Sequence, residues 1–290
     1  MDTEALIEWV LEQSVCSAFG ADAPPLLGKA VRHAVFPGGA RVRPRLCVAV
    51  AAACGAEDSL QMAAGAGAAI ELMHCASLVH DDLPAFDSAD TRRGKPSVHV
   101  VFGEALAVLA GDALIVMAFE TMLRECAPMP SRFAALTRIL IDATGAPNGI
   151  VAGQAWESEA KIDLAAYHKA KTGALFVAAT RAGAVAAGAD PAPWRLLGAR
   201  LGEAYQVADD LRDALMGDEA LGKPSGQDER LGRPSAVERL GVSGAVGELN
   251  RLIGEASASI PDCPGAGFLQ ALVAAQAARL TPASLLKRVA

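Results

Sequence analysis

Apolar residues recur at spacings of three and four along most of the chain, and alternating runs of β-branched residues are nearly absent. This period places apolar side chains on one face of a helix. Clusters of glycine and proline separate the periodic segments, and none resembles a flexible linker. The sequence therefore predicts one all-α domain over residues 1–290, a bundle of about ten helices. The segments predicted to be helical are 3–18, 42–55, 59–80, 104–124, 131–144, 161–185, 194–215, 235–257 and 266–287.

Composition narrows the class of protein. With 52% apolar residues the chain can bury a substantial core. Its most apolar stretch, residues 105–119, is short and interrupted by Asp112, so it is predicted to be a buried helix and not a membrane span. A net charge of −7 and 4% aromatic residues argue against nucleic acid as a partner. Six cysteines without a C-x-x-C pair, and no signal-peptide pattern, lead us to expect reduced thiols in a cytoplasmic protein.

A dense acidic stretch follows one predicted helix. Residues 81–94, DDLPAFDSADTRRG, place four carboxylates within ten positions and two arginines close behind them. One face of the preceding helix carries Glu71, His74, Leu78 and Asp81. Negative charge at the carboxyl end of a helix is unfavourable unless a cation binds there. Pro84 ends the helical path, so we expect Asp87 to turn back toward Asp81.

A second acidic stretch lies far along the chain, in EAYQVADDLRDALMGDEALGKPSGQD (203–228). One face of its helix carries Gln206, Asp209, Asp210 and Asp213. Clustered carboxylates without histidine or cysteine suit magnesium before zinc. Either cluster alone could be a solvated acidic surface. Two clusters followed by arginine or lysine instead favour a diphosphate held between magnesium ions and basic side chains.

Six motifs, in order and spacing, resemble those of the trans-polyprenyl diphosphate synthases over roughly residues 35–235. They are PGGARVRP, HCASLVHDD, DDLPAFD with RRG, AGQAWESE, HKAKTGALF and YQVADDLRD. The resemblance implies mostly antiparallel helices around a deep central cavity, usually in a homodimer. It implies head-to-tail condensation of an allylic diphosphate with isopentenyl diphosphate.

The resemblance also implies a role for each matching residue, with three magnesium ions. The implied metal ligands are Asp81 and Asp87 for two ions, supported by Asp82, and Asp209 for a third, with Asp210 and Asp213 around it. The residues implied to hold substrate are Arg92, Lys171 and Lys223 for the allylic diphosphate and Arg43, His74 and Arg93 for isopentenyl diphosphate. Thr172 and Gln206 would face the developing allylic cation, and no side-chain nucleophile is required.

The first motif departs from the family pattern G-G-K-R-x-R-P. Ala40 stands where relatives carry a lysine that contacts isopentenyl diphosphate. A lost charge-assisted contact costs about 1.5–3 kcal/mol, unless Arg41 or Arg45 substitutes for it. The combination of PGGARVRP with AGQAWESE resembles the branch that serves carotenoid and bacteriochlorophyll synthesis in photosynthetic bacteria.

Small residues precede the first acidic motif, where side chains of this family face down the cavity. Ala76 and Ser77 lie about 6–8 Å along the helix from Asp81, and Met73 about 12 Å. A bulky aromatic residue there would stop growth near fifteen carbons, so we expect geranylgeranyl diphosphate, a C20 product. Ala76 could instead serve only close helix packing.

Three other functions fit parts of the pattern. A farnesyl diphosphate synthase would stop at C15. A terpene cyclase shares the first acidic motif but normally replaces the second, which is intact here. A non-catalytic regulatory subunit on the same fold typically lacks one motif, and only Ala40 points that way.

Overall fold

The chain folds as a helical bundle, which confirms the predicted all-α class. The computed structural model describes residues 2–36, 39–55, 57–161, 163–215 and 235–280. The helices are α1 (Thr3–Ala18), α2 (Pro25–Val35), α3 (Val42–Ala53), η1 (Glu57–Ser59), α4 (Leu60–Asp81), α5 (Val98–Phe102), α6 (Glu104–Cys126), α7 (Pro130–Thr144), α8 (Ile150–Ala155), η2 (Trp156–Ser158), α9 (Leu164–His168), the π-helical η3 (Lys169–Gly173), α10 (Ala174–Ala186), α11 (Arg195–Leu215), α14 (Ala236–Ala258) and α15 (Ala266–Leu280). Two short strands, β1 (Thr91–Arg92) and β2 (Lys95–Pro96), pair antiparallel.

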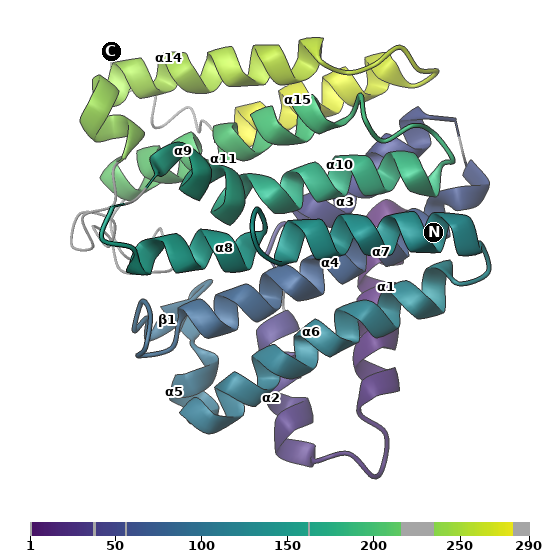
Figure 1. Ribbon diagram of the computed structural model, residues 1–290, viewed down its shortest axis with the longest axis vertical. Coiled ribbons are helices and arrows are strands. Elements are labelled where there is room, and N and C mark those ends of the chain that lie inside the picture. The colour runs from purple at the N-terminus through teal and green to yellow at the C-terminus, as the bar shows by residue number, and fades with distance from the viewer. Residues whose placement is uncertain (1, 37–38, 56, 162, 216–234, 281–290) are drawn as a thin grey trace.

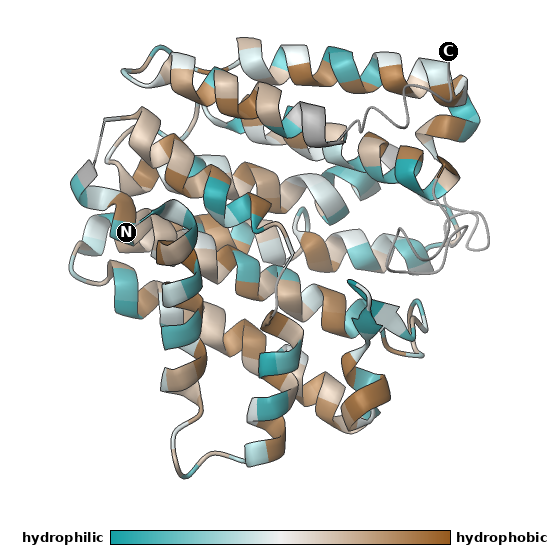
Figure 2. Ribbon diagram, turned by 180° about the vertical axis from the view of Figure 1, so that it is seen from behind, coloured by the Kyte–Doolittle hydropathy of each residue, from teal (hydrophilic) through white to brown (hydrophobic). Residues whose placement is uncertain are grey.

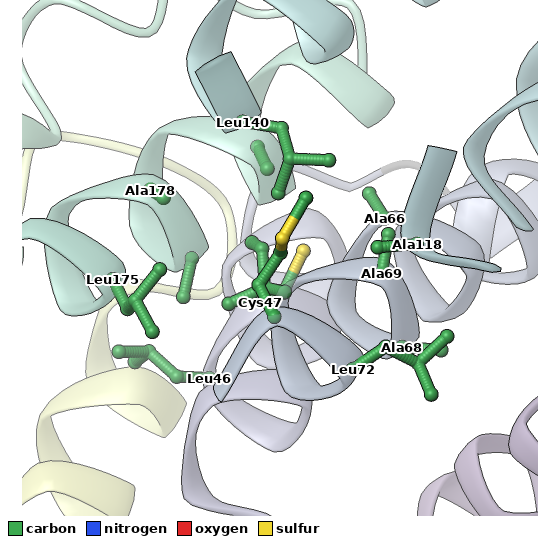
Figure 3. Close-up of a cluster of buried hydrophobic side chains, with 14 of the residues drawn as sticks. Leu46, Cys47, Ala66, Ala68, Ala69, Leu72, Ala118, Leu140, Leu175 and Ala178 are labelled. Atoms are coloured by element: carbon green, nitrogen blue, oxygen red, sulfur yellow. The ribbon is translucent and has the colours of Figure 1, made fainter. Parts of the chain in front are cut away.

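Helices α4 and α10 form the centre of the bundle. Helix α4 packs against α3, α6 and α10, and α10 packs against α3, α7 and α11. Buried side chains from five helices meet there (Figure 3). Those labelled are Leu46, Cys47, Ala66, Ala68, Ala69, Leu72, Ala118, Leu140, Leu175 and Ala178. Small residues let the helices approach closely: a side chain at Gly183 would collide with the carbonyl of Cys47. The alanine-rich periodic pattern thus encodes tight helix packing.

Helix α6 is apolar on two faces. Its inner face is buried against α4, while Val108, Leu109, Val116 and Leu123 are exposed on the other side. By length and composition alone, α4 and α6 could each cross a membrane, but 83% of the apolar window of α4 and 44% of that of α6 are buried. The prediction of a buried helix over 105–119 is therefore only half correct, since one face is open.

Several connections that carry the sequence motifs gather at one end of the bundle. The hairpin and helices α8 and α9 lie together at the left of Figure 1. The hairpin stands out as hydrophilic in Figure 2. Helix α8 packs on η3, which in turn packs on α11. This end brings together segments that are far apart in the sequence.

Candidate active site

The first acidic motif folds back on the end of α4. The helix ends at Asp81, and the backbone N–H of Asp87 donates a hydrogen bond to the carbonyl of Asp81 at 2.9 Å. The N–H of Ala89 bonds the carbonyl of Asp82 at 3.1 Å. These bonds satisfy carbonyls that a helix end leaves open. The predicted return of Asp87 toward Asp81 is therefore confirmed.

The R-R-G sequence forms the turn of the hairpin. Thr91 pairs with Pro96 and Arg92 with Lys95, which leaves Arg93 and Gly94 as a two-residue turn. Both have positive φ, 54° and 74°. Such turns match the twist of the strands, and glycine adopts this backbone without strain. Positive φ at a non-glycine residue is uncommon and is typical of functional sites.

Asp82 and Arg92 form a buried ion pair. The Nε of Arg92 donates to Oδ1 of Asp82 at 2.9 Å, and Asp82 is only 3% exposed. Burial opposes the charge of Arg92, but the hydrogen bond from Asp82 and the charges of Asp82 and Asp81 outweigh it and raise the pKa of Arg92. The pair fixes the hairpin against the end of α4.

Asp81 is a carboxylate in an unfavourable environment. Burial raises its pKa from 3.8 to about 6, and the charge of Asp87 adds to the rise. The positive charges of Lys171 and Arg92 act in the opposite direction. Asp81 thus lacks full compensation for its charge, which a divalent cation would supply.

A cluster of basic side chains lies beside this motif. Burial, followed by the charges of Arg43, Arg93, Arg92 and Arg41, holds the pKa of His74 well below its ordinary value. His74 is therefore neutral at pH 7 and can donate one ring N–H to an anion among charged guanidinium groups. The cluster is a ready site for a diphosphate.

Arg43 lies between the aromatic core and this cluster. Its guanidinium stands 4.8 Å from the centre of the Phe176 ring, in a cation–π contact. Burial lowers the pKa of Arg43, while the charges of Glu71, Tyr205 and Asp209 partly oppose the change. Arg43 therefore interacts electrostatically with the second acidic motif as well as with Arg93.

Arg41 does not replace the lysine that is missing at position 40, although it is the next residue in the sequence. It caps α3 in a left-handed conformation (φ 47°) and is 4% exposed. Its guanidinium bonds Glu8 at 2.7 Å, Glu71 at 3.0 Å and the carbonyl of Val35 at 2.9 Å. With its donors engaged, Arg41 does not replace the lysine missing at position 40.

Arg45 is also directed away from the cluster. It faces Glu4 at 3.5 Å and lines an apolar cavity of about 290 Å³ between α3, α11 and α15. Gly39 lies closer to the basic cluster, because a Cβ there would stand 3.1 Å from Nε of Arg93. The side chain of Arg93, in the hairpin, therefore lies next to the altered motif.

The π-helical segment η3 connects the two acidic motifs. Lys171 forms an ion pair with Glu157 and interacts electrostatically with Asp81. The next residue, Thr172, donates a hydrogen bond to Oε1 of Gln206 on α11 at 2.8 Å. A π-turn places consecutive side chains out of the usual helical register, which is common at functional sites.

The carboxylates of the second acidic motif lie in different environments. Asp210 is buried and accepts bonds from Nε2 of Gln206 at 2.9 Å and from the N–H of Ala236, the first residue of α14, at 2.7 Å. Asp209 is exposed and pairs with Arg212 at 2.7 Å. Asp213 is half-buried. Asp210 thus orients Gln206, while Asp209 is accessible at the surface beside Arg212.

Two groups of residues that the sequence predicts for the site are not part of the contacts described above. Lys223 falls outside the described residues. Met73 and Ala76 are each 2% exposed within the main core cluster, and Ser77 is half-buried. Among the residues that the structure describes, no three acidic, histidine or cysteine side chains already converge as a metal cage. Magnesium does not require one, since it keeps waters and shares phosphate oxygens.

The structure gives two carboxylates partners that the sequence did not predict. Glu71 neutralises buried Arg41, and Glu157 holds Lys171. Glu71 shares the helical face of His74 and Asp81, which is a usable signal. Glu157 lies in AGQAWESE, but nothing in its spacing indicates a partner fourteen residues away.

Comparison with known proteins shows to which family the chain belongs. The family model described as polyprenyl synthetase matches residues 24–259. The chain belongs to the polyprenyl synthetase family. The geranylgeranyl diphosphate synthase of Cereibacter sphaeroides is 53% identical over 289 residues and is matched over 100% of both chains. That of Rhodobacter capsulatus is 53% identical over 273 residues, 94% of each chain.

Solved structures agree with the family assignment. A geranyltransferase of Helicobacter pylori, complexed with magnesium and isoprenyl diphosphate, matches with a TM-score of 0.78 at 27% identity. The match covers 95% of this chain and 97% of that chain. The polyprenyl synthetase fold is therefore shared along nearly the whole chain, and the chain is a prenyltransferase.

Proposed function

We propose that this polyprenyl synthetase condenses an allylic diphosphate with isopentenyl diphosphate, head to tail, to give geranylgeranyl diphosphate and diphosphate. The observation that carries the proposal is the link between both acidic motifs and one basic cluster. Asp81 interacts with Lys171 and Arg92, and Arg43 interacts with both Arg93 and Asp209. The two relatives named geranylgeranyl diphosphate synthase, which match over nearly their whole length, support the C20 product.

Magnesium fits the donor set as a bridge between carboxylates and phosphate. Asp81 and Asp87 adjoin one another, Asp209 is exposed, and the described site offers oxygen ligands that a hard cation prefers. We propose that Asp81 and Asp87 hold two ions and Asp209 a third. Bound magnesium would neutralise the leaving diphosphate and so favour cleavage of the allylic C–O bond. The magnesium in the Helicobacter pylori structure supports this choice of metal.

The basic residues would divide between the two substrates. Lys171 and Arg92 flank the first acidic motif and would hold the allylic diphosphate. Arg43, neutral His74 and Arg93 would hold isopentenyl diphosphate, so its double bond lies beside the allylic carbon.

The pair Thr172–Gln206 would face the allylic cation with its oxygen atoms. Asp210 holds the Gln206 amide nitrogen, so Oε1 of Gln206 points toward Thr172. Fixed dipoles of this kind stabilise developing positive charge without reorganising. The attack of isopentenyl diphosphate forms the new C–C bond, and the proton then lost would pass to the departed diphosphate.

Product length would be set along α4. Ala76 is a small residue near the first acidic motif, and Met73 lies farther along the helix. We propose that Ala76, Ser77 and Met73 let growth pass C15 and stop near C20. Because Met73 and Ala76 are buried in the core, a change in either would alter helix packing as well as product length.

Product analysis tests the proposal. Purified protein is incubated with magnesium, isopentenyl diphosphate and C5, C10 or C15 starters, and the products are separated by chromatography. We expect C20 from each starter, with diphosphate released only when isopentenyl diphosphate is present. Products that end at C15 would favour a farnesyl diphosphate synthase. Diphosphate release without isopentenyl diphosphate would favour a cyclase, and no turnover would favour a regulatory subunit.

The exposed face of α6 suggests how copies associate. Val108, Leu109, Val116 and Leu123 form an apolar stripe on the outside of the bundle. Stripes of this kind mark interaction surfaces, and self-association through a twofold axis is the commonest arrangement. We propose a homodimer of single-domain chains in the cytoplasm, joined at α6, with no membrane span. Val116→Glu should yield monomers in sedimentation experiments, and an unchanged dimer would place the interface elsewhere.

A further inference from the structure

The motif AGQAWESE supplies a carboxylate to the site that the proposed mechanism does not use. It forms α8 and η2, and its Glu157 is partly buried. Within the described part of the chain, three side chains converge on Glu157. Lys171 and Tyr167 both donate to Oε1, Tyr167 at 2.7 Å, and Gln154 donates to Oε2 at 2.9 Å. A carboxylate with three donors is held in one orientation.

Backbone packing fixes Glu157 relative to Lys171. A side chain at Gly153 would collide with the backbone of Lys171, so α8 and η3 touch without intervening atoms. Tyr167 belongs to α9, which leads directly into η3, and its ring lies 5.8 Å from the Lys171 ammonium. Glu157, Tyr167 and Lys171 therefore form one rigid unit, although the lysine side chain alone is flexible.

Lys171 also interacts electrostatically with the first acidic motif. Its charge lowers the pKa of Asp81, and Glu157 and Asp87 raise it, so these groups share one electrostatic environment. A lysine released from Glu157 would pair with the carboxylates of the first acidic motif. Such a pair would occupy the oxygens that a metal ion needs.

We propose that Glu157 is a positioning residue that keeps Lys171 off the first acidic motif until a diphosphate arrives. In the empty site Glu157 accepts the hydrogen bond of the Lys171 ammonium, so Lys171 does not occupy the carboxylate of Asp81. When an allylic diphosphate enters with its metal ions, one phosphate oxygen replaces Glu157 as the acceptor for Lys171. No covalent bond changes in this exchange. The inference rests on the proposed function, because it assigns Lys171 to the allylic diphosphate.

A double-mutant cycle tests whether Glu157 acts through Lys171. Glu157→Gln and Lys171→Ala are made singly and together, and Glu159→Gln serves as the matched control because Glu159 is exposed in the same motif. The measurement is calorimetric binding of an unreactive thio analogue of an allylic diphosphate, titrated at several magnesium concentrations. This readout is independent of turnover. Thermal unfolding of each variant reports folding.

We expect Glu157→Gln to weaken analogue binding and raise the half-saturating magnesium concentration, each by about fivefold. The same change in the Lys171→Ala background should have no further effect. Glu157→Asp should restore part of the affinity, and Glu159→Gln should match wild type. The Michaelis constant for isopentenyl diphosphate should stay unchanged, since Glu157 is not placed near Arg43 or His74.

Two results would overturn the inference alone. An equal loss in both backgrounds would mean that Glu157 acts on the metal directly, and wild-type binding by a folded Glu157→Gln protein would leave it no positioning role. A wild-type protein that fails to bind the analogue with magnesium would overturn the proposed function together with the inference.

Discussion

Replacing Asp81 by asparagine should stabilise the empty protein while abolishing prenyl transfer. Asp81 ends α4, where the helix dipole is already negative, and burial opposes its charge. The substitution keeps the shape of the side chain and removes the charge. Residues that bind metal or substrate are often unfavourable for the fold that carries them.

The size of the expected stabilisation follows from the pKa of Asp81. Burial raises the pKa of Asp81 from 3.8 to about 6, and each unit corresponds to about 1.4 kcal/mol. The ionised carboxylate therefore lowers the free energy of unfolding at pH 7 by at most about 3 kcal/mol. Partial solvent access reduces this figure, so we expect Asp81→Asn to gain about 1–3 kcal/mol.

The effect has a defined pH dependence. Between pH 3.8 and about 6 the folded protein binds more protons at Asp81 than the unfolded chain does. The wild-type contribution from this group is thus most favourable below pH 3.8 and is lost as pH rises to about 6. The amide that replaces the carboxyl group in the variant does not titrate. The stability difference between the two proteins should therefore be large at pH 7.5 and vanish near pH 4.

Urea unfolding at both pH values measures the difference, with Asp90→Asn as the control because Asp90 is exposed in the same loop. The Asp90→Asn control should leave the free energy of unfolding unchanged at both pH values. Addition of magnesium and diphosphate should reverse the order, since only wild type binds them tightly. A destabilised Asp81→Asn protein at pH 7.5, or a gain that persists at pH 4, would refute the reasoning.

Three further predictions concern the basic motif and the product. Ala76→Tyr should shorten the product to C15 because it puts a bulky ring where the side chain is now small, and an unchanged C20 product on chromatography would remove Ala76 from chain-length control. Ala40→Lys should lower the Michaelis constant for isopentenyl diphosphate by roughly tenfold through one restored charge-assisted contact; steady-state kinetics that match wild type would show that the lysine is dispensable here. Glu71→Gln should lower the free energy of unfolding by about 3–5 kcal/mol, because it leaves buried Arg41 with one of its two described carboxylate partners; a loss below 1 kcal/mol in urea unfolding would mean that Glu8 alone compensates the charge.

Periodicity predicts the long helices well because each buries one apolar face. The predicted segments 104–124 and 194–215 correspond closely to α6 and α11. The predicted segments do not include helix α2, although it begins at Pro25, a residue favoured at helix starts. They also omit the short α8, because six residues give too little of the helical period to recognise.

The two acidic faces could be predicted because their residues are neighbours on one helix. The hairpin that presents Arg92 and Arg93 could also have been found, since Gly94 supplies a turn residue after them. Pairs of side chains from distant segments could not be predicted from the sequence. The bond from Arg41 to Glu71 joins residues thirty positions apart, and only the packing of α3 on α4 brings them together.

The same limit left open which residue, if any, replaces the lysine that is missing at position 40. Arg41 and Arg45 both lie near Ala40 in the sequence, so either could replace a missing lysine. The left-handed backbone of Arg41 turns its side chain into the bundle, where Glu8 and Glu71 hold it. Backbone conformation therefore directs Arg41 toward these two carboxylates, which the sequence alone does not indicate.

Counting bound metal tests the central claim, that both acidic motifs hold one diphosphate through metal ions. Mn²⁺ accepts the same oxygen ligands as Mg²⁺ and can be followed by electron paramagnetic resonance. We predict tight, diphosphate-dependent uptake of Mn²⁺ by wild type, and its loss in Asp81→Asn and Asp209→Asn alike. Wild-type uptake by Asp209→Asn, with loss only in Asp81→Asn, would show that the two motifs do not share a ligand and would contradict the account.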